Sequence, residues 1–350
     1  MGEERYLQLN ELIEFITVLF KKVGLSEKDS NLLAKSYVDN NMRGIDSHGV
    51  RLVPNCMKRL KEGGINPNPK IKIEAETPST ARLDGDNGLG QTVALEGMNI
   101  AIKKAEESGI GFVICTNTNN AGAMGSYTRI ALEKGMAGLS MAATIPSMFA
   151  WGGIKRVISN PPISISFPGR KTHFIIDICL GSVAWNKIYV MRDKGLPIPE
   201  GWAMDHNGEI TTDPIKAIDG GSVIPIGCHK GYGLSLAIEL LTSILGGHLF
   251  GKDLKGLFGN PKVGEGIAMT LGALDVSKLI DVDILYDRVE TFFQFIKSSP
   301  FKEGVTEIMI PGEPEEKVKK IRMKEGIPLP REVIKSLKDC AAEFNVPFPF

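Results

Sequence analysis

The 350-residue sequence has no surplus of charge of either sign, few aromatic residues and no long apolar run. Its 41 Lys plus Arg balance 41 Asp plus Glu, so it lacks the basic surface that nucleic acid or an anionic membrane requires. The most apolar helical stretch, 232–245, contains Glu239 and is too short to cross a bilayer core of ~30 Å. These absences predict no nucleic-acid partner and no membrane span, and they favour a buried helix at 232–245.

Disulfide and metal signatures are also absent from the sequence. The cysteines are odd in number, widely spaced and without a CxxC pair, and no two histidines have the spacing of a zinc site. The first ten residues carry no apolar stretch of the signal-peptide type. We therefore expect reduced thiols, no metal and a cytoplasmic protein. The five cysteines are Cys56, Cys115, Cys179, Cys228 and Cys340.

The first sixty or so residues have the pattern of three helices separated by glycines. Apolar residues recur three and four positions apart in the first of them. A capped start at Ser26 predicts a second helix that ends before Gly44. A third helix is expected to begin at Asp46 or Ser47 and to end at Gly63.

From residue 70 onward, strand patterns alternate with helical ones, which predicts an α/β fold. Helices are expected at 91–107 and 282–297, and the tail, 315–343, is predicted to be helical with a break at Pro328 and Pro330. Apolar and polar residues alternate in the segment 163–167, as expected for a strand with one solvent-exposed face. The expected strands are 111–116, 137–143, 163–167, 173–179, 266–271 and 305–310.

These elements predict a mixed-sheet core covered by a helical layer that both chain ends build. We expect a helical domain made of 1–75 plus 315–350, and a mixed α/β core over 76–314 that holds the ligands.

The stretch Asp46-Ser47-His48-Gly49-Val50-Arg51 carries the most informative chemistry. A histidine in the first turn of a helix lies beside unpaired backbone N–H groups, which favour a carboxylate. A proton donor beside an anion site suits a 2-oxo acid, because the carboxylate is held while the neighbouring oxygen is protonated. The alternative is that Asp46 or Ser47 only caps the helix and that His48 is a surface residue.

Nucleotide-binding fingerprints are missing, since neither G-x-G-x-x-G nor a P-loop occurs. Two loops are compatible with a nucleotide. Lys230 lies at the start of an apolar helix, where backbone donors could meet a phosphate, and Glu313 lies in a rigid Pro-Gly-Glu-Pro turn, 311–314. Ordinary strand-to-helix connections explain both loops equally well.

Eight stretches, in this order and spacing, together carry a family resemblance. From about residue 7 to about 317 the chain resembles the type-2 malate/L-lactate dehydrogenase family, which also includes ureidoglycolate, sulfolactate and diketogulonate enzymes and cyclic ketimine reductases. The matching stretches are Gly44 to Val50, Asn117 to Gly122, Trp151 to Gly153, Ser159 to Pro161, Pro197 to Trp202, Thr211 to Pro214, His229 to Gly233 and Pro311 to Pro314.

The resemblance implies a homodimeric oxidoreductase that binds NAD or NADP in a fold other than the Rossmann domain. By the same resemblance, His48, with Ser47 beside it, is the acid/base group next to a small anionic substrate. The implied nucleotide contacts are Thr144, Asp177, Ile178, Cys179, Lys230, Gly312, Glu313 and Pro314.

Two positions depart from the family pattern. Asn120 is followed by Ala121 where many members have a histidine, and an amide can orient a carbonyl but exchanges no proton at a useful pKa. Many members have a substrate-clamping arginine four residues after the acid/base histidine. Leu52 occupies that place here, and Arg51 precedes it by about 100° of helix rotation.

The leading hypothesis is an NAD(P)-dependent reductase of a small 2-oxo acid in which His48 donates the proton. A helix dipole disfavours the imidazolium, so Asp46 or another carboxylate would have to offset it. The alternative is reduction of the C=N bond of a cyclic ketimine acid, which the altered Asn120 and Arg51 positions motivate. A third hypothesis is a dinucleotide-binding relative without activity.

Overall fold

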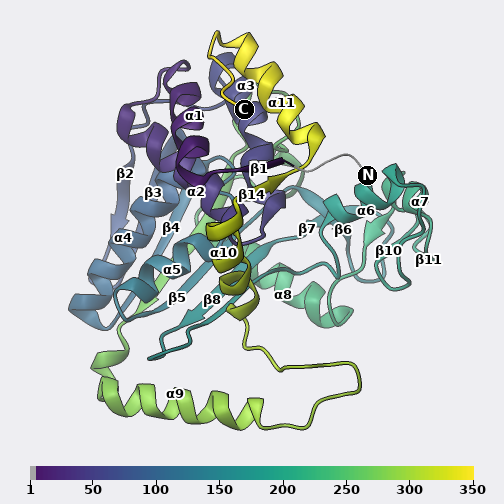
Figure 1. The fold of residues 1–350 in the computed structure, drawn as a ribbon. Coiled ribbons are helices and arrows are strands. Elements are labelled where there is room, and N and C mark those ends of the chain that lie inside the picture. The colour runs from purple at the N-terminus through teal and green to yellow at the C-terminus, as the bar shows by residue number, and fades with distance from the viewer. Residues whose placement is uncertain (1–4) are drawn as a thin grey trace.

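A seven-stranded mixed sheet forms the centre of the protein in a computed structural model that describes residues 5–350 (Figure 1). Only β3 and β4 pair in parallel, and the other neighbours are antiparallel. The sheet therefore differs from the parallel Rossmann sheet, and the predicted mixed α/β class is confirmed. In spatial order the strands are β2 (Lys72–Glu76), β3 (Thr80–Gly88), β4 (Ile110–Thr118), β13 (Ile267–Leu274), β5 (Ala137–Ala142), β8 (Pro162–Phe167) and β9 (Phe174–Cys179).

Helices cover both faces of this sheet. Neighbouring residues of a strand point to opposite faces, and in β5 the hydroxyl of Ser140 donates to the carbonyl of Met124 while Met141 packs with Ile238. The first contact faces the α5 side and the second faces α8. The covering helices are α4 (Gly90–Ser108) and α5 (Gly125–Glu133) on one face, and α8 (His229–Glu239), continued by a π-helical turn, Leu240–Ile244, on the other.

The two ends of the chain build one helical layer, as the purple and yellow helices of Figure 1 show. A single apolar cluster joins them, and β1 (Arg5–Leu7) pairs with β14 (Ile327–Leu329). The predicted cap is confirmed, because Ser26 Oγ accepts from Asp29 N at 3.0 Å. The helices are α1 (Leu9–Lys21), α2 (Glu27–Met42), α3 (Val53–Glu62), α10 (Glu313–Glu325) and α11 (Arg331–Glu343). The two-domain boundaries themselves stay a prediction.

Apart from β8 and β9, the elements between β5 and α8 form a small lobe with its own apolar cluster, which includes Met148 and Val223. Its elements are β6 (Pro146–Phe149), β7 (Arg156–Ser159), α6 (Trp185–Asp193), β10 (Ala203–Met204), β11 (Ile210–Thr211), α7 (Pro214–Ile218) and β12 (Ser222–Val223).

Farther along the chain, short 3-10 turns at Gly251–Asp253 and Val276–Lys278 lead to α9 (Val282–Lys297), at the bottom of Figure 1. This helix packs Val289 and Phe293 near Phe174.

The predicted start of the third helix is wrong. Two 3-10 turns, Asp46–His48 and Val50–Leu52, precede α3. Gly49 between them is extended, with φ −88° and ψ −157°, and the side chain of Asn41 accepts from the backbone N of Val50 at 2.8 Å. Because His48 therefore lies in a single 3-10 turn, the helix-dipole argument for an anion site does not apply.

The predicted strand 305–310 is also absent from the described residues. Residues 301–312 form an irregular connection, and the backbone N of Ile310 donates to Glu313 Oε2 at 2.7 Å instead of to a neighbouring strand. The apolar residues that suggested a strand serve packing instead, because Ile310 is buried in one cluster with Val289 and Phe293 of α9. The tail does break at Pro328, but the break is the strand β14.

The expected strand 163–167 is confirmed, and its buried face is the serine face. Ser164 and Ser166 are buried and hydrogen-bond to Thr128 of α5. Ile165 is 43% exposed on the opposite side. Alternation predicted the strand but not which face would be covered, because that depends on which helix packs against the sheet.

The predicted buried helix at 232–245 is buried on one side only. Ser235 and Ile238 face the interior, whereas Leu234 and Leu245 are 52% and 56% exposed. None of the helices within residues 5–350 combines the length and apolarity that a membrane crossing needs.

Candidate active site

A cavity of about 450 Å³ opens where the helical layer, the sheet and the small lobe meet. Its wall contains the segment around His48, the loop after β4 at 120–124, the residues after β5, the strand β9 and the start of α10. Catalytic and cofactor sites of enzymes have this size and this concave shape. The cavity brings together segments that lie up to 272 residues apart in the chain, from Arg43 to Glu315.

His48 is half-buried on the wall of the cavity, with Ser47 beside it. Ser47 Oγ lies 2.9 Å from His48 Nδ1, so the hydroxyl holds one ring nitrogen and leaves Nε2 as the nitrogen available for proton exchange. Burial lowers the pKa of His48 below its ordinary value, and the positive charge of Arg51 lowers it further. The ring is therefore neutral near pH 7, the form that accepts a proton.

The backbone around His48 is held by two asparagines and an ion pair. Asn40 Nδ2 donates to the carbonyl of His48 at 3.0 Å, and Asn41 Nδ2 donates to Asp46 Oδ1 at 2.6 Å. Arg322 also binds both carboxylate oxygens of Asp46, at 2.6 and 3.0 Å. The carboxylate of Asp46 is thus engaged by Arg322, and the hypothesis that Asp46 stabilises a protonated His48 is not supported.

Asn120 also lines the cavity, at the end of β4. Its Oδ1 accepts from the backbone N of Gly122 at 3.0 Å, which holds the turn of the loop. The side-chain Nδ2 is therefore the atom that can donate to a carbonyl or carboxylate oxygen of a ligand. The backbone N of Asn120 donates to the buried carboxylate of Glu265 at 3.1 Å.

The same cavity also carries residues predicted to contact the nucleotide. Asp177 Oδ2 accepts from the backbone N of Gly125 at 2.7 Å, and burial raises the pKa of this carboxyl despite that bond and the nearby Arg129. Gly312 has φ +102°, where a side chain would be strained, and its bare backbone contributes to the wall. The predicted contacts in the cavity are Thr144, Asp177, Ile178, Cys179 and Gly312.

These groups fit a nicotinamide nucleotide. The carboxylate of Asp177 and the hydroxyl of Thr144 can accept or donate hydrogen bonds to ribose hydroxyls and to a carboxamide. Gly312 places no side chain at this point of the wall, so a flat or phosphorylated group can approach its backbone closely. A bound NADH or NADPH would supply the hydride of the reaction.

Four predicted site residues lie outside this cavity. Arg51 lines a neighbouring cavity of about 490 Å³ that shares Ser47 with the first. Glu313 lines a third cavity, and its carboxylate accepts from Lys297 Nζ at 2.5 Å and from the backbone N of Ile310. Lys230 is exposed on α8, and Pro314 is in the first turn of α10. For these residues, the predicted contacts would require a ligand that extends beyond the main cavity or a movement of the chain.

Several lining residues were not predicted from the sequence. Arg43 and Arg129 share Asp39 as a partner, with contacts of 2.9 and 3.2 Å, and therefore add a charged network to one wall. Nothing in the sequence distinguishes an arginine that lines a cavity, such as Arg43 after α2 or Arg129 in α5, from an arginine that is exposed to solvent. The unpredicted lining residues with polar groups are Arg43, Arg129, Ser147, Asn160, Trp185 and Glu315.

Comparisons with known proteins agree with this geometry. The malate/L-lactate dehydrogenase family model matches residues 7–338. The chain is 39% identical over 337 residues to L-sulfolactate dehydrogenase of Methanocaldococcus jannaschii, covering 96% of each chain. It is 35% identical over 353 residues to malate dehydrogenase of Pyrococcus horikoshii, covering 98% of this chain and 97% of the relative. The solved structure of sulfolactate dehydrogenase from M. jannaschii superposes with a TM-score of 0.92 at 37% identity, covering 98% of both chains.

The chain therefore belongs to the malate/L-lactate dehydrogenase family. It is an oxidoreductase. At the level of the family, this membership confirms the predicted activity, hydride transfer between NAD or NADP and a small 2-hydroxy or 2-oxo acid.

Proposed function

We propose that this enzyme interconverts a small 2-hydroxy acid and its 2-oxo acid, with His48 exchanging the proton of the oxygen. The observation that carries the proposal is the placement of His48, oriented by Ser47 at 2.9 Å, in one cavity with the nucleotide-compatible Asp177 and Gly312. Named relatives act on malate and sulfolactate, and both names describe 2-hydroxy acids with a second acidic group. A substrate of this chemical class suits the cavity.

In this proposal His48 is neutral in the free protein and protonated when an oxo acid is bound. In the free protein its lowered pKa keeps the ring neutral, so it is ready to accept the proton of a hydroxy acid. For the reverse reaction, the carboxylate of a bound oxo acid provides the negative charge that favours the imidazolium. The stabilising negative charge that was predicted to come from Asp46 or another carboxylate is thus supplied by the substrate itself. Asn120 Nδ2 orients the substrate oxygen by donating a hydrogen bond.

A substrate panel tests the proposal. Purified protein is assayed with NADH and with NADPH on 2-oxo acids with and without a second acidic group, and on cyclic imino acids. We expect turnover of 2-oxo acids that is lost in His48→Ala. Turnover of the cyclic imines alone would replace the proposal with the ketimine reductase alternative. Tight binding of either cofactor without turnover on any acid would favour a relative without activity.

We infer that the enzyme is a homodimer and that α8 with its π-helical turn forms part of the interface. Leu234, Leu240 and Leu245 are 52%, 56% and 56% exposed there, and Ile165 of β8 is exposed on the same face of the sheet. An apolar surface of this kind marks an interaction site, and the family resemblance implies a second copy as the partner.

We also propose a cytoplasmic location. All five cysteines are free thiols, and Cys56, Cys115 and Cys340 are buried. Free thiols are typical of proteins kept in a reducing compartment.

A further inference from the structure

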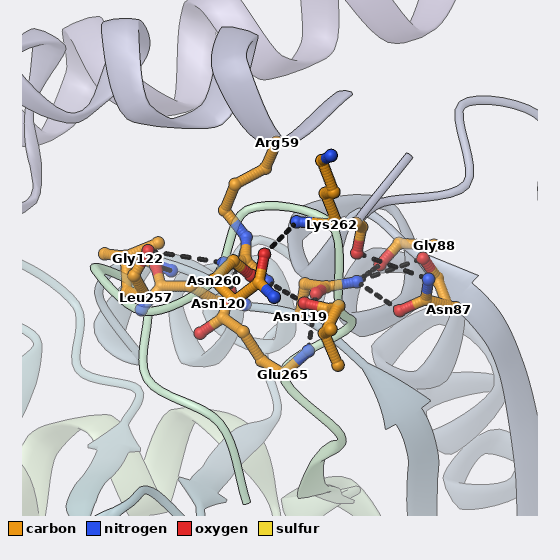
Figure 2. Close-up of polar contacts among 12 residues, drawn as sticks. Arg59, Asn87, Gly88, Asn119, Asn120, Gly122, Leu257, Asn260, Lys262 and Glu265 are labelled. Atoms are coloured by element: carbon orange, nitrogen blue, oxygen red, sulfur yellow. Dashed lines mark hydrogen bonds and ion pairs between the residues drawn. The ribbon is translucent and has the colours of Figure 1, made fainter. Parts of the chain in front are cut away.

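Arg59 and Glu265 form a buried charged pair directly behind the active-site wall (Figure 2). Arg59 is completely buried and Glu265 is 1% exposed, and Arg59 Nε lies 3.8 Å from Glu265 Oε1. Removing two charges from water costs more than such a long contact returns, so stability alone is a weak explanation for the pair. Its contacts point to another role.

Glu265 holds the loop that carries Asn120. Its Oε1 accepts from the backbone N of Asn120 at 3.1 Å, and its own backbone N donates to Asn119 Oδ1 at 3.0 Å. Asn119 Nδ2 then donates to the carbonyls of Asn87 and Gly88, at 3.0 and 2.9 Å. Figure 2 shows these residues converging between β3, β4 and the segment before β13. The turn at 119–120 is thus fixed from both sides.

Arg59 connects this loop to the helix that follows His48. It lies on α3, which four residues, the extended Gly49 and the 3-10 turn Val50–Leu52, separate from the His48 turn. Its guanidinium donates to the carbonyls of Leu257, Asn260 and Val263 at 3.5, 3.4 and 2.5 Å. These carbonyls belong to the loop that leads into Glu265. The pair therefore spans the gap between the segment of His48 and the segment of Asn120.

We propose that Glu265, held by Arg59, is a positioning residue that sets Asn120 relative to His48. Neither Arg59 nor Glu265 lines the active-site cavity, so they act through the Asn119–Asn120 turn. This inference rests on the proposed function, in which Asn120 orients the substrate. It predicts that disturbing Glu265 weakens binding of the acid while the nucleotide, whose predicted contacts Asp177 and Gly312 belong to other segments of the wall, binds as before.

The positioning of Asn120 depends on pH, because it depends on the charge state of Glu265. Burial raises the pKa of Glu265 to about 7, although the N–H of Asn120 and the charge of Arg59 lower it. The other titratable groups that face it are Tyr37 of α2 and Cys56 of α3, and burial raises the pKa of both, so they stay neutral. Above neutral pH the carboxylate is ionised and accepts the N–H of Asn120 more strongly.

Two variants of Glu265 separate positioning from folding. Glu265→Gln keeps an acceptor for the N–H of Asn120 but no charge, and we expect its KM for the oxo acid to stay within about threefold of wild type. Glu265→Leu removes the acceptor, and we expect its KM to rise at least about tenfold while the Kd for NADH changes less than about twofold. The matched control is Lys104→Met, which breaks the ion pair of the buried Lys104 with the exposed Glu76, at 2.9 Å, outside the cavity lining. It should lower Tm without changing KM. An unchanged KM in Glu265→Leu would overturn the proposal.

A second measurement does not depend on activity. The sequence contains two Asn-Asn pairs, 40–41 and 119–120, so labelling asparagine with ¹³C at the carbonyl and ¹⁵N selects the amides of Asn41 and Asn120. We expect the amide proton shift of Asn120 to titrate near neutral pH in wild type and not in Glu265→Gln. Retention of the same titration in Glu265→Gln, or its absence in wild type, would show that Glu265 does not act on this turn. Failure of the proposed function would instead appear as absent turnover in wild type with this titration intact.

Discussion

Ser47 Oγ lies 2.9 Å from Nδ1 of His48 on the wall of the main cavity. This contact connects two adjacent residues of the 3-10 turn Asp46–His48. The hydroxyl fixes the ring and leaves Nε2 toward the ligand. Several measurable consequences follow from the position of His48 and from the surfaces around it.

Replacement of His48 by Ala should lower turnover at least about a hundredfold, since loss of a general acid or base typically has an effect of this size. The Kd for NADH should remain unchanged, because the residues expected to contact the nucleotide, such as Asp177 and Gly312, belong to other segments of the cavity wall. Steady-state rates and fluorescence titration measure the two quantities. His206→Ala, at an exposed turn, is the matched control. Turnover equal to wild type in His48→Ala would remove His48 from the mechanism.

Replacement of Ser47 by Ala should leave His48 present but less well oriented. We expect kcat to fall by up to roughly tenfold, the equivalent of one hydrogen bond, with little change in Tm. Thermal unfolding alongside steady-state kinetics distinguishes this result from a general loss of stability. A variant with wild-type kcat would show that the contact at 2.9 Å does not orient the ring during catalysis.

The pH dependence should follow His48. Its pKa is below the ordinary value, so kcat/KM for oxidation of a hydroxy acid should fall as the pH drops through that pKa and stay level above it. Reduction of the oxo acid should show the opposite trend, because it needs the protonated ring. Since Arg51 lowers the pKa of His48, Arg51→Gln should move the inflection to higher pH, whereas Arg51→Lys should not. Identical profiles for the two variants would exclude this electrostatic effect.

The same Arg51 variants examine the predicted substrate clamp. If Arg51 binds the carboxylate of the acid, KM should rise at least about tenfold in Arg51→Gln. Arg51 lines the neighbouring cavity, so this clamp requires the substrate to reach past Ser47.

Leu245→Glu should convert the proposed dimer into a monomer. A carboxylate at this exposed apolar position would be buried without a partner in the proposed interface, which costs several kcal/mol. Sedimentation velocity measures the change in mass. Ile215→Glu, at a residue that is 63% exposed on α7, should remain dimeric. A wild-type protein that sediments as a monomer would contradict the inferred interface.

Gly90→Ala should reduce binding of the acid although alanine favours helices. A Cβ at the start of α4 would lie 2.1 Å from the carbonyl oxygen of Asn119 and 2.5 Å from the backbone of Asn120, so the turn must move. We expect KM to rise more than Tm falls. Gly153→Ala, where the Cβ meets neighbours only at 3.4 Å or more, should leave KM unchanged. Equal KM values in the two variants would argue against a rigid turn at Asn120.

Local patterns predicted much of the secondary structure. The helix 282–297 has the predicted bounds, and the cap at Ser26 has the predicted hydrogen bond. Both depend on residues within one or two turns of each other, so the sequence contains the whole cause. The third helix was predicted to begin too early, because Asn41, in the preceding helix, binds the backbone at Val50 and keeps Gly49 extended.

The sequence by itself determined that the chain is a mixed α/β protein of this family with a histidine in a Ser-His-Gly turn, because periodicity and ordered motifs are properties of neighbouring residues. Only the tertiary structure decided which charged groups serve the site. Asp46 pairs with Arg322, 276 residues away, and Glu265 accepts from Asn120, 145 residues away. Whether a carboxylate is a surface charge, a partner of a distant arginine or a support for a loop depends on what packs against it, and no local pattern records that.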